Sequence, residues 1–161
     1  KLKTKKLIRV MPNTPALVQE GMSVMSMCDC FPDKDINIVR EIFMSVGHVL
    51  TLKEKDMDAV TAVSGSGPAF IALFVEGMIE AGVKLGLTEN SAAELAIQTI
   101  IGTAEMLKTG MTPQKLREMV TSPGGTTAAG LRSFEENGLK KIINEALITA
   151  KKRAEELGRR Q

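Results

Sequence analysis

Apolar residues in the first third of the chain occur in short runs that are typical of strands. Residues 7–10 form one run, which stops at a Met-Pro-Asn-Thr-Pro segment (11–15), where two prolines forbid a continued strand or helix. Residues 21–27 alternate polar and apolar, which predicts a half-buried strand, and residues 49–52 form another short run. A helix capped by its opening Asp is expected over about 33–45. This order is typical of the end of a larger α/β sheet.

From about residue 54 the pattern becomes helical. Pro68 suits the first position of a helix, and Thr88 opens another, with a Ser91-x-x-Glu94 capping-box pattern just inside it. Gly110 and Gly138 are expected to end helices. The predicted helices cover about residues 55–63, 68–85, 88–108, 113–120, 126–136 and 139–158.

Two of these helices are apolar on nearly every side. Seven of residues 70–79 are Phe, Ile, Leu, Val or Met, and residues 92–104 are rich in Ala, Leu and Ile. A helix that is apolar all round must be buried all round, and a segment this short cannot bury two such helices alone. We therefore expect a partner surface, most simply a two-fold dimer with interlocked helices. One compact helical core is the alternative.

Composition excludes several classes of protein. The 161 residues are 43% hydrophobic and 25% charged, close to the average for globular proteins. The 21 Lys and Arg against 19 Asp and Glu give a net charge of +2, which argues against a nucleic-acid binder. The absence of Trp and Tyr removes the aromatic platforms that stack on single strands.

The cysteines, the basic first residues and the longest apolar stretch indicate the compartment in which the protein works. Cys28 and Cys30, with one His in the chain, predict neither a metal site nor a disulfide framework, which favours a reducing cytoplasm. Residues 1–6 are basic with no apolar core behind them, unlike a signal peptide. The apolar stretch 59–75 contains a Ser-Gly-Ser-Gly-Pro break (64–68), so we expect it not to span a bilayer as one helix. The sequence thus predicts a soluble, cytoplasmic protein with no metal, nucleic-acid or membrane partner.

The strongest local signal for chemistry is Val-Thr-Ser-Pro-Gly-Gly-Thr-Thr at 120–127. Two glycines that follow a proline and lead into a helix allow successive N–H groups to point into one concavity. The positive end of the next helix adds to this, which predicts an anion site that needs no Arg. A plain helix-to-helix turn capped by Thr126 or Thr127 is the alternative.

Two further segments are candidate ligand sites. Residues 64–68 place glycines and hydroxyls before a helix but lack the Lys of a phosphate loop, so a tight packing turn is the alternative. Residues 11–15 follow the carboxyl end of a predicted strand, where α/β sheets bind ligands, with a rigid proline turn as the alternative.

Taken together, these segments resemble the pyrroline-5-carboxylate reductase family. The resemblance runs in order over essentially the whole chain, and the block around Ser122-Pro123-Gly124-Gly125 is close to the family's signature. The matching segments are residues 8–16, 58–61, 64–69, 82–87 and 116–127.

The resemblance implies a mainly α protein. Residues 54–161 would form an interleaved helical dimerisation and substrate-binding domain, like the C-terminal domain of 6-phosphogluconate dehydrogenase. Residues 1–53 would be the small α/β remnant of a Rossmann domain, because no Gly-x-Gly-x-x-Gly fingerprint precedes them. A homodimer, or a higher oligomer of dimers, is implied.

The resemblance also implies the chemistry. The enzyme would reduce a cyclic imino acid, 1-pyrroline-5-carboxylate, to L-proline by hydride transfer from NADPH or NADH. The imine is largely protonated near neutral pH, so positioning and electrostatics would suffice. Thr127 is similar to the family's threonine that meets the ring nitrogen and is the implied catalytic residue. The implied substrate-binding residues are Ser122, Gly124, Gly125, Thr126, Thr127 and Glu54.

The nucleotide end of the cofactor is where the chain departs from the family. Asn13, Thr61 and Ser66 are the implied cofactor-binding residues, at the nicotinamide end alone. Met119 stands where some relatives have Asn. Without the nucleotide-binding half we expect the chain alone to be inactive. An isolated, non-catalytic dimerisation module is the alternative function.

Overall fold

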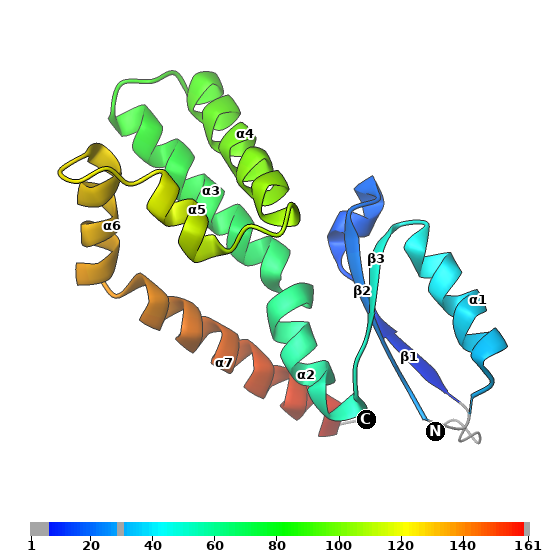
Figure 1. Ribbon diagram of the computed structural model, residues 1–161. Helices are drawn as coiled ribbons and strands as arrows, with labels where there is room; N and C mark the ends of the chain where they lie inside the picture. The colour runs from blue at the N-terminus through cyan, green and yellow to red at the C-terminus, as the bar shows by residue number, and fades with distance from the viewer. Residues whose placement is uncertain (1–6, 29–30, 160–161) are drawn as a thin grey trace. The chain divides into compact units, whose positions relative to one another are not determined.

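A small mixed sheet lies in the first of two compact units, which comprises residues 1–70 and 144–161. The computed structural model describes residues 7–28 and 31–159 (Figure 1). Strand β1 (Ile8–Met11) pairs antiparallel with β2 (Gly21–Met27), and β2 pairs parallel with β3 (Gly47–Thr51). The predicted strands are therefore confirmed, as is a small α/β part that precedes the helices.

Two helical connections join the strands. A 3-10 helix (Thr14–Val18) links β1 to β2, and α1 (Asp33–Met44) links β2 to β3 and packs against β3. The expectation that Asp33 caps α1 is wrong, because Pro32 holds the N-cap position and Asp33 is the first helical residue. Its carboxylate still lies at the positive end of the helix, where negative charge is favourable.

Strand β2 is buried on both faces, so the prediction of a half-buried strand is wrong. Ser23 and Ser26, which lie on opposite faces of the strand, are 1% and 2% exposed. The central position of β2 between β1 and β3, with helices packed on the sheet, explains the difference. Alternating polar and apolar residues indicate a strand buried on one face only when no other element covers the second face of the sheet.

The core of this unit forms where α2 (Met57–Val60) packs on β2. Met57 is fully buried, Val60 is 8% exposed, and both pack with Val24 of β2. Partly buried apolar side chains surround this cluster: Met11, Met22 and Leu52.

The chain from Glu54 to Lys84 follows one helical path. A 3-10 turn (Glu54–Asp56) leads into α2, then into a π-helix (Thr61–Gly65) and then into α3 (Gly67–Lys84). The expected glycine turn at 64–68 is therefore wrong. Neither glycine of that run has a positive φ, and the Ser66 N–H donates to the Thr61 carbonyl at 2.8 Å, which continues the helix as a wider turn.

This helical path also removes the reason given for excluding a membrane span. Glu54–Lys84 is long and apolar enough to cross a bilayer by length and composition, with a mean hydropathy of 1.5 over its most apolar window. Only 6% of that window is buried within this chain. The criterion by itself is weak, since core helices of soluble proteins also meet it. A helix whose apolar surface is covered by a partner subunit would also be long and apolar enough to meet this criterion.

The residue that follows β2, Cys28, is disulfide-bonded. The sequence had led us to expect reduced thiols. The other cysteine of the chain, Cys30, lies outside the described residues.

The second unit, Ile71–Ile143, is entirely helical where it has regular structure. It contains most of α3, then α4 (Glu89–Lys108), α5 (Pro113–Met119), α6 (Thr126–Glu136) and the start of α7 (Leu139–Arg159). These bounds confirm the predicted helices closely. The capping box at Ser91-x-x-Glu94 is wrong, because Thr88 is the cap and its hydroxyl oxygen accepts from the Ser91 N–H at 3.2 Å.

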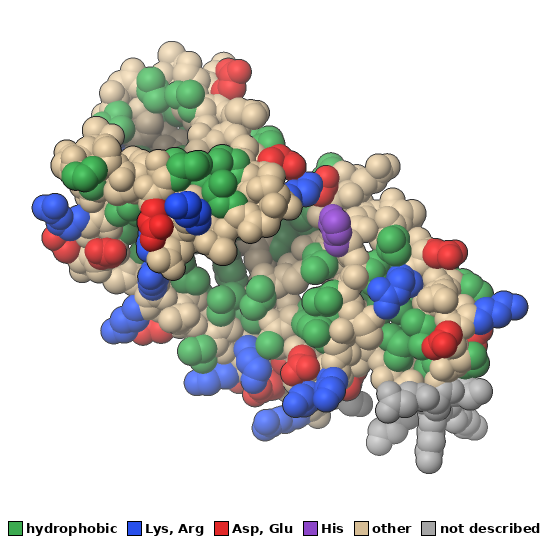
Figure 2. Space-filling model, in the orientation of Figure 1, with side chains coloured by type: hydrophobic (Ala, Val, Ile, Leu, Met, Phe, Trp, Pro, Cys, Tyr) green, Lys and Arg blue, Asp and Glu red, His purple; other side chains and the backbone are tan. Residues whose placement is uncertain are grey.

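Within the second unit, little apolar surface is buried. The residues of α3 and α4 that are fully buried are small: Gly82, Ala92 and Ala96. Figure 2 shows apolar side chains on the displayed surface among the charged ones. Those of α3 and α4 that are at least 37% exposed are Phe70, Ile71, Leu73, Phe74, Val83, Leu95, Ile97 and Ile101. A single compact helical core is therefore not what this chain forms by itself.

The start of β3 provides a test of the sheet. Gly47 has a φ of +145°, and a Cβ there would overlap the carbonyl oxygen of Gly21. We expect Gly47→Ala to lower the free energy of unfolding by more than about 2 kcal/mol, because backbone atoms cannot yield as a side chain can. Urea unfolding monitored by circular dichroism measures it.

The matched control is Gly158→Ala in α7, where nothing lies within 4 Å of the new Cβ. It should leave stability unchanged or raise it by about 0.5 kcal/mol. Equal stability of the two variants would contradict the described register of β2 and β3.

Candidate active site

The loop between α5 and α6 is a tight turn built on its two glycines. Gly124 has a φ of +72°, a conformation that side chains other than glycine rarely adopt. The Gly125 N–H donates to the Ser122 carbonyl at 3.1 Å, which closes the turn. Gly125 is the N-cap of α6, and no side chain caps it. The amide of Gly125 is thus used within the turn and is not available to a ligand, so donors for an anion must come from the residues that follow.

The first turn of α6 provides donors for an anion. Its first intrahelical bond runs from the Ala129 N–H to the Gly125 carbonyl at 3.1 Å. The N–H groups of Thr126, Thr127 and Ala128 precede that bond, so the helix offers them no acceptor. The first turn contains no acidic residue, and the helix dipole favours negative charge there.

Hydroxyl groups surround these amides. A Cβ on Gly125 would overlap the Ser122 hydroxyl oxygen, so this hydroxyl lies directly over the glycine. Thr126 is exposed and Thr127 is half-buried. The loop therefore offers amides and neutral hydroxyls, a set that suits a small carboxylate.

The residues expected near the nicotinamide lie in the first unit. Asn13, after β1, donates from its Nδ2 to the Ser64 carbonyl at 3.2 Å and to the Ser64 hydroxyl at 3.4 Å. Its Oδ1 accepts from the Met22 N–H at 2.8 Å. The Thr61 hydroxyl donates to the Met57 carbonyl at 2.9 Å. The structure thus brings Asn13 to the π-helix that contains Thr61 and is followed by Ser66.

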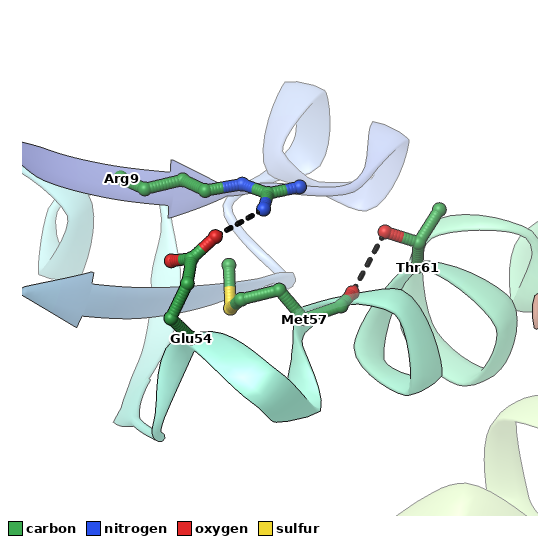
Figure 3. A network of polar contacts seen from close by, with 4 residues as sticks. All are labelled: Arg9, Glu54, Met57 and Thr61. Carbon is green, nitrogen blue, oxygen red and sulfur yellow. Dashed lines mark hydrogen bonds and ion pairs between the residues drawn. The ribbon is translucent and has the colours of Figure 1, made fainter. Parts of the chain in front are cut away.

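Glu54 is held by a residue that the sequence motifs did not single out. Its carboxylate pairs with the Arg9 guanidinium at 2.5 Å, beside the buried Met57 (Figure 3). The two side chains are 63% and 44% exposed, so water surrounds the pair. The sequence did contain a signal for this pair, because Arg9 is a charged residue inside the apolar run 7–10.

A surface pair on α7 has shifted pKa values. Lys151 donates to Glu155 at 2.6 Å, and this hydrogen bond raises the pKa of Lys151 and lowers that of Glu155. The pair lies four residues apart on one helix face. It belongs to a solvated surface, which fits the charge pattern of this segment.

The predicted site residues fall into two groups. Asn13, Thr61, Ser66 and Glu54 belong to the first unit, and the Ser122–Thr127 loop belongs to the second. Each group has its own geometry and its own chemistry.

A comparison with protein families decides to which one the chain belongs. Residues 54–157 match the model described as pyrroline-5-carboxylate reductase dimerisation. The chain belongs to the pyrroline-5-carboxylate reductase family. The resemblance found from the sequence motifs is therefore confirmed.

Curated relatives carry the same name. A pyrroline-5-carboxylate reductase from Synechocystis is 44% identical over 96% of this chain and 58% of its own length. One from Arabidopsis thaliana is 46% identical over 94% of this chain and 55% of its own length. The chain thus spans little more than half the length of these relatives.

Solved reductases share the fold. The crystal structure from Plasmodium falciparum, described as having NADP bound, has a TM-score of 0.89 at 43% identity, over 95% of this chain and 62% of the other. The structure from Coxiella burnetii has a TM-score of 0.92 at 37% identity, over 97% of this chain and 59% of the other.

Because the Arg9–Glu54 pair is exposed to solvent, we expect it to contribute little to stability. We expect Glu54→Gln to change the free energy of unfolding by less than about 1 kcal/mol, because exposed ion pairs contribute little. Urea unfolding measures it, with Glu41→Gln on α1 as the control. A much larger loss would show that this pair is a structural requirement of the unit.

Proposed function

We propose that this chain provides the substrate loop and the subunit interface of an enzyme that reduces 1-pyrroline-5-carboxylate to L-proline. The observation that carries the proposal is the Ser122–Thr127 loop, whose α6 amides are free to bind an anion in a chain of the reductase family. Hydride would come from NADPH or NADH. Residues 54–161 would be the domain that binds substrate and dimerises, and residues 1–53 the end of a nucleotide-binding domain.

The substrate carboxylate is assigned to the first turn of α6. The N–H groups of Thr126 and Thr127 lack intrahelical acceptors, and the Ser122 hydroxyl lies beside them. No charged side chain is needed, since amides at a helix start favour an anion. Gly124 contributes its left-handed φ, which sets the turn, and Gly125 has no Cβ, so the Ser122 hydroxyl can lie over it.

Thr127 is assigned to the ring nitrogen of the imine. Its hydroxyl is a neutral donor and acceptor on the half-buried side of the first turn. A protonated iminium needs a partner that orients it rather than a strong acid. The loop would therefore act by positioning, which can account for large rate effects without a titrating residue.

The residues that we assign to the cofactor would serve its nicotinamide end. A Cβ added to Gly67 would meet nothing within 4 Å, which leaves open space beside Ser66. The sequence contains no Gly-x-Gly-x-x-Gly loop that would hold the pyrophosphate. When bound, the cofactor supplies the hydride. Asn13, Thr61 and Ser66 would bound its nicotinamide end, and Glu54 would lie near substrate with Arg9 orienting its carboxylate.

A homodimer is supported by the uncovered faces of α3 and α4. Leu73 is 66% exposed and Leu95 is 58% exposed, and the family model that matches this segment is named for dimerisation. Apolar surface of this extent is stabilised by a second subunit. A second copy of the chain would explain why the most apolar window of Glu54–Lys84 is little buried.

The substrate loop is tested by Gly125→Val in a full-length reductase carrying this sequence. The added side chain displaces the Ser122 hydroxyl, whose oxygen occupies the position of the new Cβ. We expect KM for the imine to rise at least about tenfold while the dimer persists. Steady-state kinetics and sedimentation measure the two quantities.

Gly130→Ala, four residues into α6 with nothing within 4 Å of its Cβ, is the matched control and should leave KM unchanged. An unchanged KM in Gly125→Val would reject the assignment of this loop.

The interface is tested by Leu95→Glu on α4. Leu95 is 58% exposed in the single chain, so most of its surface makes no internal contact. We expect the dimer to dissociate, since the interface would have to bury an unpaired charge. Analytical ultracentrifugation measures it, with Lys152→Glu on the charged face of α7 as control. A dimer of wild-type affinity in the Leu95 variant would place the interface elsewhere.

A further inference from the structure

The carbonyl of Ser64 has no backbone donor in the helical path from α2 to α3. In an α-helix the carbonyl of residue i accepts from the N–H of residue i+4. The carbonyl of Ser64 would accept from residue 68, which is Pro68 and has no N–H. Ser64 is half-buried, so its carbonyl is partly withheld from water, and an unpaired carbonyl there is costly.

The side chain of Asn13 supplies the missing donor. Its Nδ2 lies 3.2 Å from the Ser64 carbonyl oxygen, although 51 residues separate the two in sequence. The other end of the same amide is fixed, because Oδ1 accepts from the Met22 N–H at 2.8 Å. One half-buried side chain thus ties the end of β1, the start of β2 and the π-helix together.

We propose that Asn13 is a positioning residue that replaces the donor lost at Pro68 and holds the π-helix Thr61–Gly65 in place for the cofactor. The proposal rests on the proposed function in one respect, that this segment adjoins the nicotinamide. With both ends of its amide engaged, Asn13 acts through Ser64 and the hydroxyls of Thr61 and Ser66. The wider π-helical turn, closed by the Ser66 N–H on the Thr61 carbonyl at 2.8 Å, is what the tether maintains.

The proposal predicts that substitutions at Asn13 and Pro68 are coupled, because both residues determine whether the Ser64 carbonyl has a hydrogen-bond donor. Asn13→Asp keeps the size of the side chain and an oxygen acceptor for Met22, but it removes the donor to Ser64. Pro68→Ala restores a backbone N–H at residue 68, and the proposal requires that this group donate to the Ser64 carbonyl, as it would in an α-helix. The double variant should therefore recover what Asn13→Asp loses.

The first measurement is hydrogen exchange, residue by residue, on the chain itself. We expect the amides of residues 61–66 to exchange about tenfold faster in Asn13→Asp and to return to within about twofold of Pro68→Ala in the double variant. Amides of α1 serve as the internal reference. If Asn13→Asp does not fold, the neutral Asn13→Ala replaces it in the same four-protein comparison.

The second measurement is hydride transfer in a full-length reductase carrying this sequence. Asn13→Asp should raise KM for the nicotinamide cofactor about five- to tenfold and change KM for the imine by less than about twofold. Pro68→Ala should rescue the cofactor KM in the double variant. A purely structural role would lower the amount of folded enzyme and leave this ratio of KM values alone.

The outcomes separate the two proposals. Unchanged exchange at residues 61–66, or a raised cofactor KM that Pro68→Ala does not rescue, overturns the positioning role; the second result shows that Asn13 contacts the cofactor directly. Coupled exchange in an enzyme that does not reduce the imine supports the tether and overturns the proposed function.

Discussion

The packing of α2 on the central strand β2 is the interaction on which the first unit depends. Met57 is fully buried and Val60 nearly so, and both contact Val24 of a strand that is covered on its two faces. Apolar burial of this kind is the main favourable term in folding. It fixes where the helical path from Glu54 begins, and it brings the π-helix beside Asn13. The residues assigned to the cofactor owe their mutual positions to this contact.

Two glycine-proline segments of similar composition have opposite roles. In Ser-Gly-Ser-Gly-Pro (64–68) neither glycine has a positive φ, so the chain continues as a helix and the proline's missing donor is supplied by Asn13. In the Ser122–Thr127 loop, Gly124 has a φ of +72° and reverses the chain, which leaves the first amides of α6 unpaired. One segment accepts a hydrogen bond from a side chain, and the other leaves backbone donors without an acceptor in the helix.

The helices of the second unit carry the apolar surface for which the single chain has no cover. Their buried residues are Gly or Ala, which let backbones approach closely, while Leu, Ile and Phe remain outside. Such an arrangement gives a surface suited to a second subunit. The apolar residues of α3 are also the reason why Glu54–Lys84 is apolar enough, by composition, to cross a membrane.

Periodicity, caps and breakers in the sequence were enough to predict the strands, the helix bounds from α3 onward, the need for a partner and the loop at 120–127, because these are local properties of the chain. The pairing of Glu54 with Arg9, the burial of Ser23 and Ser26, and the π-helix at Thr61–Gly65 were decided only in the tertiary structure. The first two depend on residues distant in sequence, and the Asn13 amide reaches the Ser64 carbonyl from 51 residues away.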